Sequence, residues 1–138
     1  MDIQKIGVIG AGQMGNGIAH VMALAEYDVL LNDIDQDALN NALEIIRGNL
    51  ARQASRGKIT DAQVEAALSR VSTTQDISEV GQTDLVIEAA TERETIKQAI
   101  FDSLLPHLQP HTILTSNTSS ISITRLASRT ASFRLCVT

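Results

Sequence analysis

The chain has 138 residues, 43% of them apolar and 2% aromatic, which is enough for one domain with a core of aliphatic side chains. A net charge of −5 without a basic stripe argues against nucleic acid as the main partner, and the single cysteine, Cys136, excludes an internal disulfide framework. No apolar segment has the pattern of a membrane span or a signal peptide, so we expect a cytoplasmic protein, and no metal site is predicted.

The first 55 residues alternate between strand and helix patterns. Apolar residues within 3–9 predict a buried parallel strand that runs into glycines, and residues 14–26 follow with a helical pattern. A second short strand is predicted at 29–31, ahead of Asp35, which is suited to cap the next helix. That helix, at about 37–55, has its apolar residues on one face.

The alternation continues through the rest of the chain. Thr60 and Gln63 have the spacing of a capping box and predict a helix that ends near residue 69, which makes 37–69 a helical hairpin. The remaining predicted elements, in chain order, are a strand from Val71, a helical turn or loop at 76–80, a strand at 84–89, a helix at 95–105 closed by Pro106, a strand at 112–115 and a short helix at 121–127. The predicted fold is α/β: a doubly wound parallel sheet of the Rossmann type, with the helical hairpin inserted after the second strand.

A glycine-rich run lies between the first strand and the first helix. It reads Gly10, Ala11, Gly12, Gln13, Met14 and Gly15. In this context Gly10 permits a tight turn, Gly12 lets the backbone approach a pyrophosphate, and Gly15 lets the helix pack closely on the strand. The helix N-terminus would then face the phosphates of a dinucleotide. The alternative is that these glycines only form a turn.

An acidic residue, Asp33, ends the second strand 23 residues after Gly10. A carboxylate at this position can accept hydrogen bonds from the adenosine ribose. It would repel the 2′-phosphate of NADP, and no arginine adjoins it, so NAD is the predicted cofactor. Two alternatives stay open: a surface loop acid, and FAD, which uses the same fingerprint within longer chains.

Three stretches of sequence resemble the 3-hydroxyacyl-CoA dehydrogenase family, including bacterial 3-hydroxybutyryl-CoA dehydrogenases. They are IGVIGAGQMGNGIA at 6–19, DLVIEAATE at 84–92 with Lys97 after it, and TSNTSS at 115–120, and the resemblance covers roughly residues 3–130. It implies that Glu92 and Lys97 contact the nicotinamide-side ribose and phosphates of NAD. It also implies that Asn117 lines the nicotinamide and substrate site, and that Ser119 hydrogen-bonds the substrate oxygen. Without the resemblance, these would be a solvated acid–base pair and an ordinary polar loop.

The resemblance also assigns a role to the predicted helical hairpin. In the family this extension projects from the fold and helps to hold coenzyme A, and Asn49 and Arg56 fall on the corresponding contact positions. Arginine often pairs with phosphate, although a solvated helix tip would carry the same residues. The implied activity is NAD-dependent oxidation of a (3S)-3-hydroxyacyl-CoA to its 3-oxoacyl-CoA, in fatty-acid or short-chain acyl-CoA metabolism. The alternative is a non-catalytic module that binds NAD and coenzyme A, or a truncated remnant.

The sequence departs from the family toward its end. The family's general base is a histidine in an HFxNP-like segment, about twenty residues after the position of Ser119, and no such segment occurs in these residues. Residues 1–130 are therefore expected to form the NAD-binding domain, without the helical domain through which the family dimerises, and to be inactive alone. Residues 131–138 form an atypical tail whose alternating pattern could add an edge strand. The three histidines present, His20, His107 and His111, are expected at the surface or at helix ends.

A second departure concerns the turn between the first helix and the second strand. Glu26 stands where glycine is common, because the backbone there often adopts a left-handed conformation. If that conformation is kept, the glutamate costs about 1 kcal/mol of stability.

Overall fold

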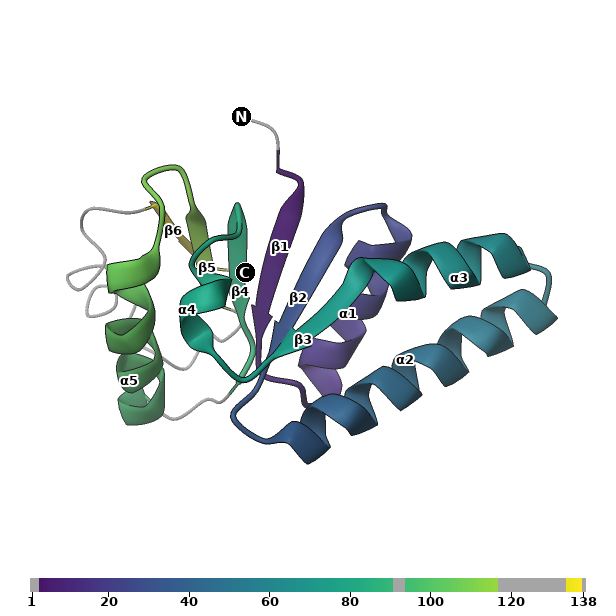
Figure 1. Ribbon diagram of the computed structural model, residues 1–138, viewed down its shortest axis with the longest axis horizontal. Coiled ribbons are helices and arrows are strands. Elements are labelled where there is room, and N and C mark those ends of the chain that lie inside the picture. Colours follow the sequence, from purple (N-terminus) through teal and green to yellow (C-terminus); the bar gives the residue numbers. More distant parts are fainter. Residues whose placement is uncertain (1–2, 91–93, 117–133, 138) are drawn as a thin grey trace.

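Parallel strands form the centre of the protein in the computed structural model, which describes residues 3–90, 94–116 and 134–137. Within these residues a sheet of six strands runs in the order β3-β2-β1-β4-β5-β6 (Figure 1), and every adjacent pair is parallel. The strands are β1 (Lys5–Ile9), β2 (Asp28–Asn32), β3 (Val71–Thr74), β4 (Leu85–Glu88), β5 (Ile113–Ser116) and β6 (Arg134–Val137). This order confirms the predicted doubly wound sheet. The edge strand expected near residue 135 is also present, because β6 pairs with β5.

Helices cover both faces of the sheet and enclose two aliphatic cores. One core lies under α1 (Gln13–Leu24), α2 (Gln36–Ser55) and α3 (Asp61–Arg70), and the other lies under α4 (Ile77–Val80) and α5 (Glu94–Leu104). Successive side chains of β1 pack into different cores, since Val8 belongs to the first core and Ile9 to the second. Helices α2 and α3 form the predicted hairpin between β2 and β3, and they project beyond the edge of the sheet (Figure 1). No helix in the described part of the chain is long and apolar enough to cross a bilayer.

The starts of α2 and α3 are fixed by local side chains, as predicted. The carboxylate of Asp35 accepts a hydrogen bond from the backbone N–H of Asp37, and this cap begins α2. At the start of α3, Thr60 and Gln63 each accept a hydrogen bond from the other's backbone N–H, at 3.1 and 2.8 Å. Both arrangements satisfy N–H groups that a helix leaves without intrahelical partners, so the start of each helix is set by its own sequence.

The first helix is shorter than the 14–26 predicted. It ends at Leu24 with Ala25 as its C-cap, and Glu26 then has a φ of 75°. A left-handed residue cannot continue the helix, so the chain turns here into β2. The left-handed conformation expected for Glu26 is therefore kept, at a position where a side chain is strained.

Replacing Glu26 by glycine should stabilise the protein. Glu26→Gly relieves the left-handed strain, and we expect the free energy of unfolding to rise by about 1 kcal/mol, measured by urea denaturation. The matched control is Ala25→Gly, since Ala25 is also exposed but has a negative φ of −78°. Glycine at that position only adds freedom to the unfolded chain and should lower stability. A decrease in stability for Glu26→Gly would contradict the assignment of strain.

The amino edge of the sheet is held by the carboxylate of Asp84, just before β4. It accepts hydrogen bonds from the backbone N–H groups of Gln4 and Lys5, both at 3.0 Å, and its second oxygen lies 2.8 Å from Nε2 of His111. The bond from Gln4, then the His111 side chain and the Lys5 bond, lower the pKa of Asp84. One side chain thus connects the beginnings of β1, β4 and β5.

This arrangement predicts how stability depends on pH. Because the pKa of Asp84 is lower in the folded than in the unfolded chain, its contribution is complete above the ordinary value of about 4 and is lost as the pH falls further. We expect Asp84→Asn to lower the free energy of unfolding at pH 7, and the difference from wild type to shrink below about pH 4. Asp28→Asn, at the start of β2, is the control. An equal difference at pH 7 and pH 3 in urea titrations would refute the role of the carboxylate.

Candidate functional site

The site lies where the strand order changes direction, between β1 and β4. In open parallel sheets a crevice forms at this point, outside the carboxyl ends of the strands. Gly10 follows β1 directly and has a φ of 104°. A Cβ atom on Gly10 would lie 2.6 Å from the Cα atom of Ala90, which follows β4. Position 10 can therefore be occupied only by glycine, because any side chain would collide with the backbone that follows β4.

Two further glycines shape the turn into α1. A Cβ atom on Gly15 would lie 1.6 Å from the carbonyl oxygen of Gly10, so helix and turn are in backbone contact. For Gly12, by contrast, no atom of the described residues beyond its chain neighbours lies within 4 Å of the position of its Cβ. The space beside Gly12 is open and lies next to the first backbone N–H groups of α1.

The start of α1 also lacks a side-chain cap. Gly12 is its N-cap residue and makes no side-chain hydrogen bond, whereas Asp35, Thr60 and Asp76 cap α2, α3 and α4. The first N–H groups of a helix need acceptors, and the helix dipole favours a negative charge there. A phosphate group beside Gly12 would satisfy both requirements.

The carboxylate of Asp33 joins the end of β2 to the glycine turn. One of its oxygens accepts a hydrogen bond from the backbone N–H of Ala11 at 2.9 Å, and the other accepts from that of Asp35 at 3.0 Å. A carboxylate has about four acceptor positions, so two bonds fix its orientation and leave capacity for hydroxyl groups of a ligand. The structure thus brings Asp33 and the fingerprint together, as the spacing predicted.

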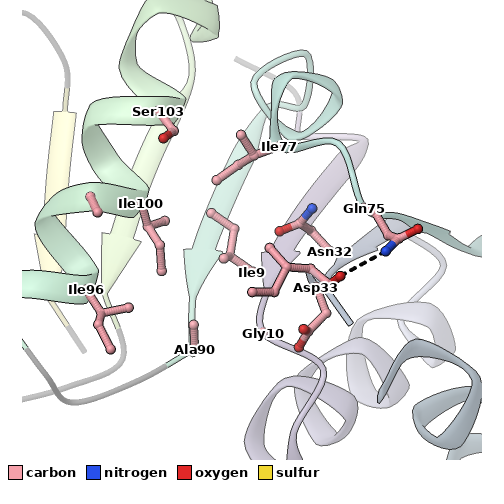
Figure 2. A pocket seen from close by; sticks show the side chains of 12 residues that line it. Ile9, Gly10, Asn32, Asp33, Gln75, Ile77, Ala90, Ile96, Ile100 and Ser103 are labelled. Carbon is pink, nitrogen blue, oxygen red and sulfur yellow. Dashed lines mark hydrogen bonds between the residues drawn. The ribbon is translucent and has the colours of Figure 1, made fainter. Parts of the chain in front are cut away.

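A cavity of about 580 Å³ opens between Asp33 and helix α5. Figure 2 shows Ile96, Ile100 and Ser103 on the α5 side, with Asp33 and Gln75 opposite them. Its lining is Ile9, Gly10, Asn32, Asp33, Ile34, Gln75, Ile77, Ala90, Ile96, Ala99, Ile100 and Ser103. Among the described residues this lining is largely apolar, contains one acid and contains no basic residue.

Several of these residues were not found from the sequence. Gln75 and Ile77 follow β3. The side-chain amide of Gln75 donates a hydrogen bond to the backbone oxygen of Ile34 at 2.8 Å (Figure 2). Ile96 and Ile100 come from α5, far along the chain. The available signal was the position of Gln75 after a predicted strand, since carboxyl ends of parallel strands share one edge.

A second cavity, of about 370 Å³, lies between α1 and α2. It contains both residues predicted on the hairpin, Asn49 and Arg56, together with Gly17, His20, Val21, Arg52 and Gln53. The surface position expected for His20 is only partly right. The ring is half-buried, and its Nε2 atom lies 2.8 Å from Oε1 of Gln53, because α2 packs across α1 there.

Four predicted site residues belong to parts of the chain about which less is described. Glu92, Asn117 and Ser119 lie outside the described residues, as does the helix predicted at 121–127. Lys97 is a residue of α5, with its side chain outside the described part. Their assigned roles remain predictions.

Comparisons with known proteins agree with this geometry. The family model for the NAD binding domain of 3-hydroxyacyl-CoA dehydrogenase matches residues 5–138. The 3-hydroxybutyryl-CoA dehydrogenase of Bradyrhizobium diazoefficiens is 52% identical over 128 residues, which cover 93% of this chain and 44% of that protein. The 3-hydroxyadipyl-CoA dehydrogenase of Escherichia coli is 45% identical over 127 residues, covering 92% and 27%.

Solved structures show the same likeness. The (S)-3-hydroxybutyryl-CoA dehydrogenase of Ralstonia eutropha superimposes with a TM-score of 0.93 and 35% identity, over 99% of this chain and 48% of that one. The chain therefore spans less than half the length of these relatives. The match to the family model over nearly the whole sequence shows that the chain belongs to the 3-hydroxyacyl-CoA dehydrogenase family, as an NAD-binding domain.

Proposed function

We propose that the chain is the cofactor-binding part of an enzyme that oxidises a (3S)-3-hydroxyacyl-CoA to the 3-oxoacyl-CoA. The observation that carries this is the glycine turn at the start of α1. Its N-cap residue, Gly12, has no side chain, and the carboxylate of Asp33 accepts a hydrogen bond from the N–H of Ala11. NAD, when bound, supplies the acceptor for the hydride. The chain's own contribution is to bind and orient the cofactor.

The residues present fit each part of NAD. The open space beside Gly12, at the N-terminus of α1, suits the pyrophosphate. The remaining acceptor positions of Asp33 suit the ribose hydroxyls. The cavity beyond offers apolar walls, including Ile34, whose side chain is 87% exposed and available to pack on a planar base. Because the described residues of the lining include the acid Asp33 and no base, NAD should bind more tightly than NADP.

The second cavity is proposed to hold phosphates of coenzyme A. Arg52 and Arg56 both line it, and a guanidinium group is suited to phosphate. Helix α1 would then carry the NAD pyrophosphate at its start and coenzyme A on its side. Asn117 and Ser119 are proposed to contact the substrate oxygen and nicotinamide, and Glu92 and Lys97 the adjoining ribose and phosphates, as the family resemblance implies.

Turnover measurements test this function. Residues 1–138 should bind NAD but form little or no NADH with 3-hydroxybutyryl-CoA, because the HFxNP-like segment that the resemblance implies for the general base does not occur among them. A rate comparable to that of ordinary dehydrogenases would overturn the expected inactivity. No detectable binding of NAD at millimolar concentration in calorimetry would overturn the proposed function itself. Binding of NAD and coenzyme A without turnover is the expected result.

A further inference from the structure

The glycine turn and Asp33 do not determine which base a dinucleotide carries. The turn faces phosphates and the carboxylate of Asp33 suits ribose hydroxyls, and dinucleotides with different bases share both groups. The base itself would lie in the cavity between Asp33 and α5. A choice between bases therefore requires a polar group in the lining of that cavity.

Asn32, the last residue of β2, is a polar residue on an apolar face of the sheet. Side chains alternate along a strand, so Asn32 lies on the same face as Leu30, and the register of the sheet pairs it with Ile9. Leu30 and Ile9 both belong to the core under α4 and α5. Asn32 is only 3% exposed. A buried amide lowers stability unless its polar atoms find partners, so the partners of its nitrogen and of its oxygen both matter.

The nitrogen of the Asn32 amide is held by the end of the neighbouring strand β3. It donates a hydrogen bond to the backbone oxygen of Thr74 at 3.1 Å, and the same oxygen accepts from the backbone N–H of Asp33 at 3.3 Å. A carbonyl oxygen can only accept, so turning the amide over would place two acceptors against each other. The amide therefore has one orientation, with its nitrogen toward β3 and its oxygen away from β3.

The oxygen of the Asn32 amide faces the cavity. Figure 2 shows this oxygen turned toward Ile9, with the nitrogen on the opposite side. Among the described residues no donor is bound to the oxygen, and no fully enclosed side-chain oxygen or nitrogen in that part of the chain lacks a partner. The oxygen of Asn32 is therefore in contact with the open space of the cavity that it lines. An acceptor at this place calls for a donor on the ligand.

The other polar side chains in the described lining do not supply such an acceptor. The nitrogen of Gln75 donates to the backbone oxygen of Ile34 at 2.8 Å, and Figure 2 shows the oxygen of Gln75 turned away from the cavity. Ser103 is exposed on α5, and its hydroxyl can rotate to donate or to accept. The carboxylate of Asp33 is held at the glycine turn, where the ribose is proposed to lie. In the described lining, Asn32 is thus the side chain whose fixed hydrogen-bonding character faces the base.

We propose that Asn32 selects adenine as the base of the dinucleotide, by accepting a hydrogen bond from its 6-amino group. This rests on the proposed function, which places the base in this cavity. Adenine has a donor at position 6, whereas guanine and hypoxanthine have an oxo group there, which is an acceptor. An oxo group would leave the buried oxygen of Asn32 unpaired and opposite another acceptor. A site built to bind a donor rejects an analogue that lacks it.

Titration of the full chain with NADH and with reduced nicotinamide hypoxanthine dinucleotide tests the proposal. The two ligands differ only in the base, where an oxo group replaces the 6-amino group, and the fluorescence of the reduced nicotinamide reports binding of both. Wild type should bind NADH about tenfold more tightly, the effect of one hydrogen bond to a buried acceptor. Asn32→Leu keeps the shape of the side chain and removes the acceptor, so it should bind both ligands alike. Asn32→Ala, which adds no bulk, takes its place if Asn32→Leu does not fold.

Gln75→Leu is the matched control, because it removes the other amide of the same cavity together with its bond to a backbone oxygen. It should keep the wild-type preference for NADH, and loss of the preference in this variant as well would overturn a specific role of Asn32. Equal affinity of wild type for both ligands overturns that role and leaves the proposed function standing. A preference that survives in the Asn32 variants also overturns it, since another group then selects the base. Binding of neither ligand by wild type overturns the proposed function, and the role of Asn32 with it.

Discussion

Gly15→Ala is expected to destabilise the fold and abolish NAD binding, while Gly12→Ala weakens binding alone. The new methyl group at position 15 would lie 1.6 Å from the carbonyl oxygen of Gly10, a backbone atom that can move only if the turn opens. Such overpacking should cost about 3 kcal/mol and lower the melting temperature by roughly 10 °C. The turn that receives the pyrophosphate would be lost with it.

Gly12 provides the matched control for this prediction. Its φ of −69° and ψ of −167° suit alanine, and in the described part of the chain no atom beyond the adjacent residues lies within 4 Å of the added methyl group. Stability should change by less than about 1 kcal/mol. The methyl group would stand where the pyrophosphate approaches, so NAD affinity should fall about tenfold or more. Thermal denaturation and NAD titration of both variants check this. Normal stability of Gly15→Ala would contradict the backbone contact, and normal NAD affinity of Gly12→Ala would contradict the phosphate position.

The second large effect is expected from Asp33→Asn. The substitution keeps the size of the side chain but removes the negative charge that accepts ribose hydroxyls and repels a 2′-phosphate. Hydrogen bonds to charged groups contribute about 1.5–3 kcal/mol, so NADH affinity should fall by about 10- to 100-fold. The preference for NADH over NADPH should fall as well. Titration with both dinucleotides measures the two effects together.

Asp37→Asn is the control for Asp33. Asp37 is an exposed acid in the first turn of α2, and its contact with the Asp35 cap uses its backbone N–H, which the substitution keeps. The NADH affinity of the Asp37→Asn variant should equal that of wild type. An unchanged ratio of NADH to NADPH affinity in Asp33→Asn would show that another group sets the cofactor preference.

Local signals explain why much of the fold could be predicted. The caps at Asp35 and Thr60 involve residues within three positions of one another, so the sequence contains both partners of each hydrogen bond. The turn at Glu26 was also predictable, because a helix that reverses into a strand commonly needs a left-handed residue. The end of α1 was placed too late, since apolar periodicity continues through the residues where the backbone already turns.

The walls of both cavities depend on tertiary contacts and were harder to predict. Gln75 lies beside Asp33 only because β3 pairs with β2, and Ile96 faces them only because α5 packs on the other side. His20 is half-buried because α2 crosses α1, a contact with residues more than thirty positions away. A single sequence contains no record of such neighbours, whereas the glycine fingerprint and Asp33 carry their own backbone requirements.

The central position of β1 has a consequence for synthesis of the protein. Its partner β4 begins beside Asp84, which binds the N–H of Lys5 across 79 positions of the chain. At a translation rate of about 5–20 residues per second, roughly 4 to 16 s pass before that partner has been made. During this interval β1 can pair with β2 but has an open edge, the kind of surface that promotes association between nascent chains. The crevice between Gly10 and Ala90 closes only afterwards, so NAD can recognise and stabilise only chains that have completed this pairing.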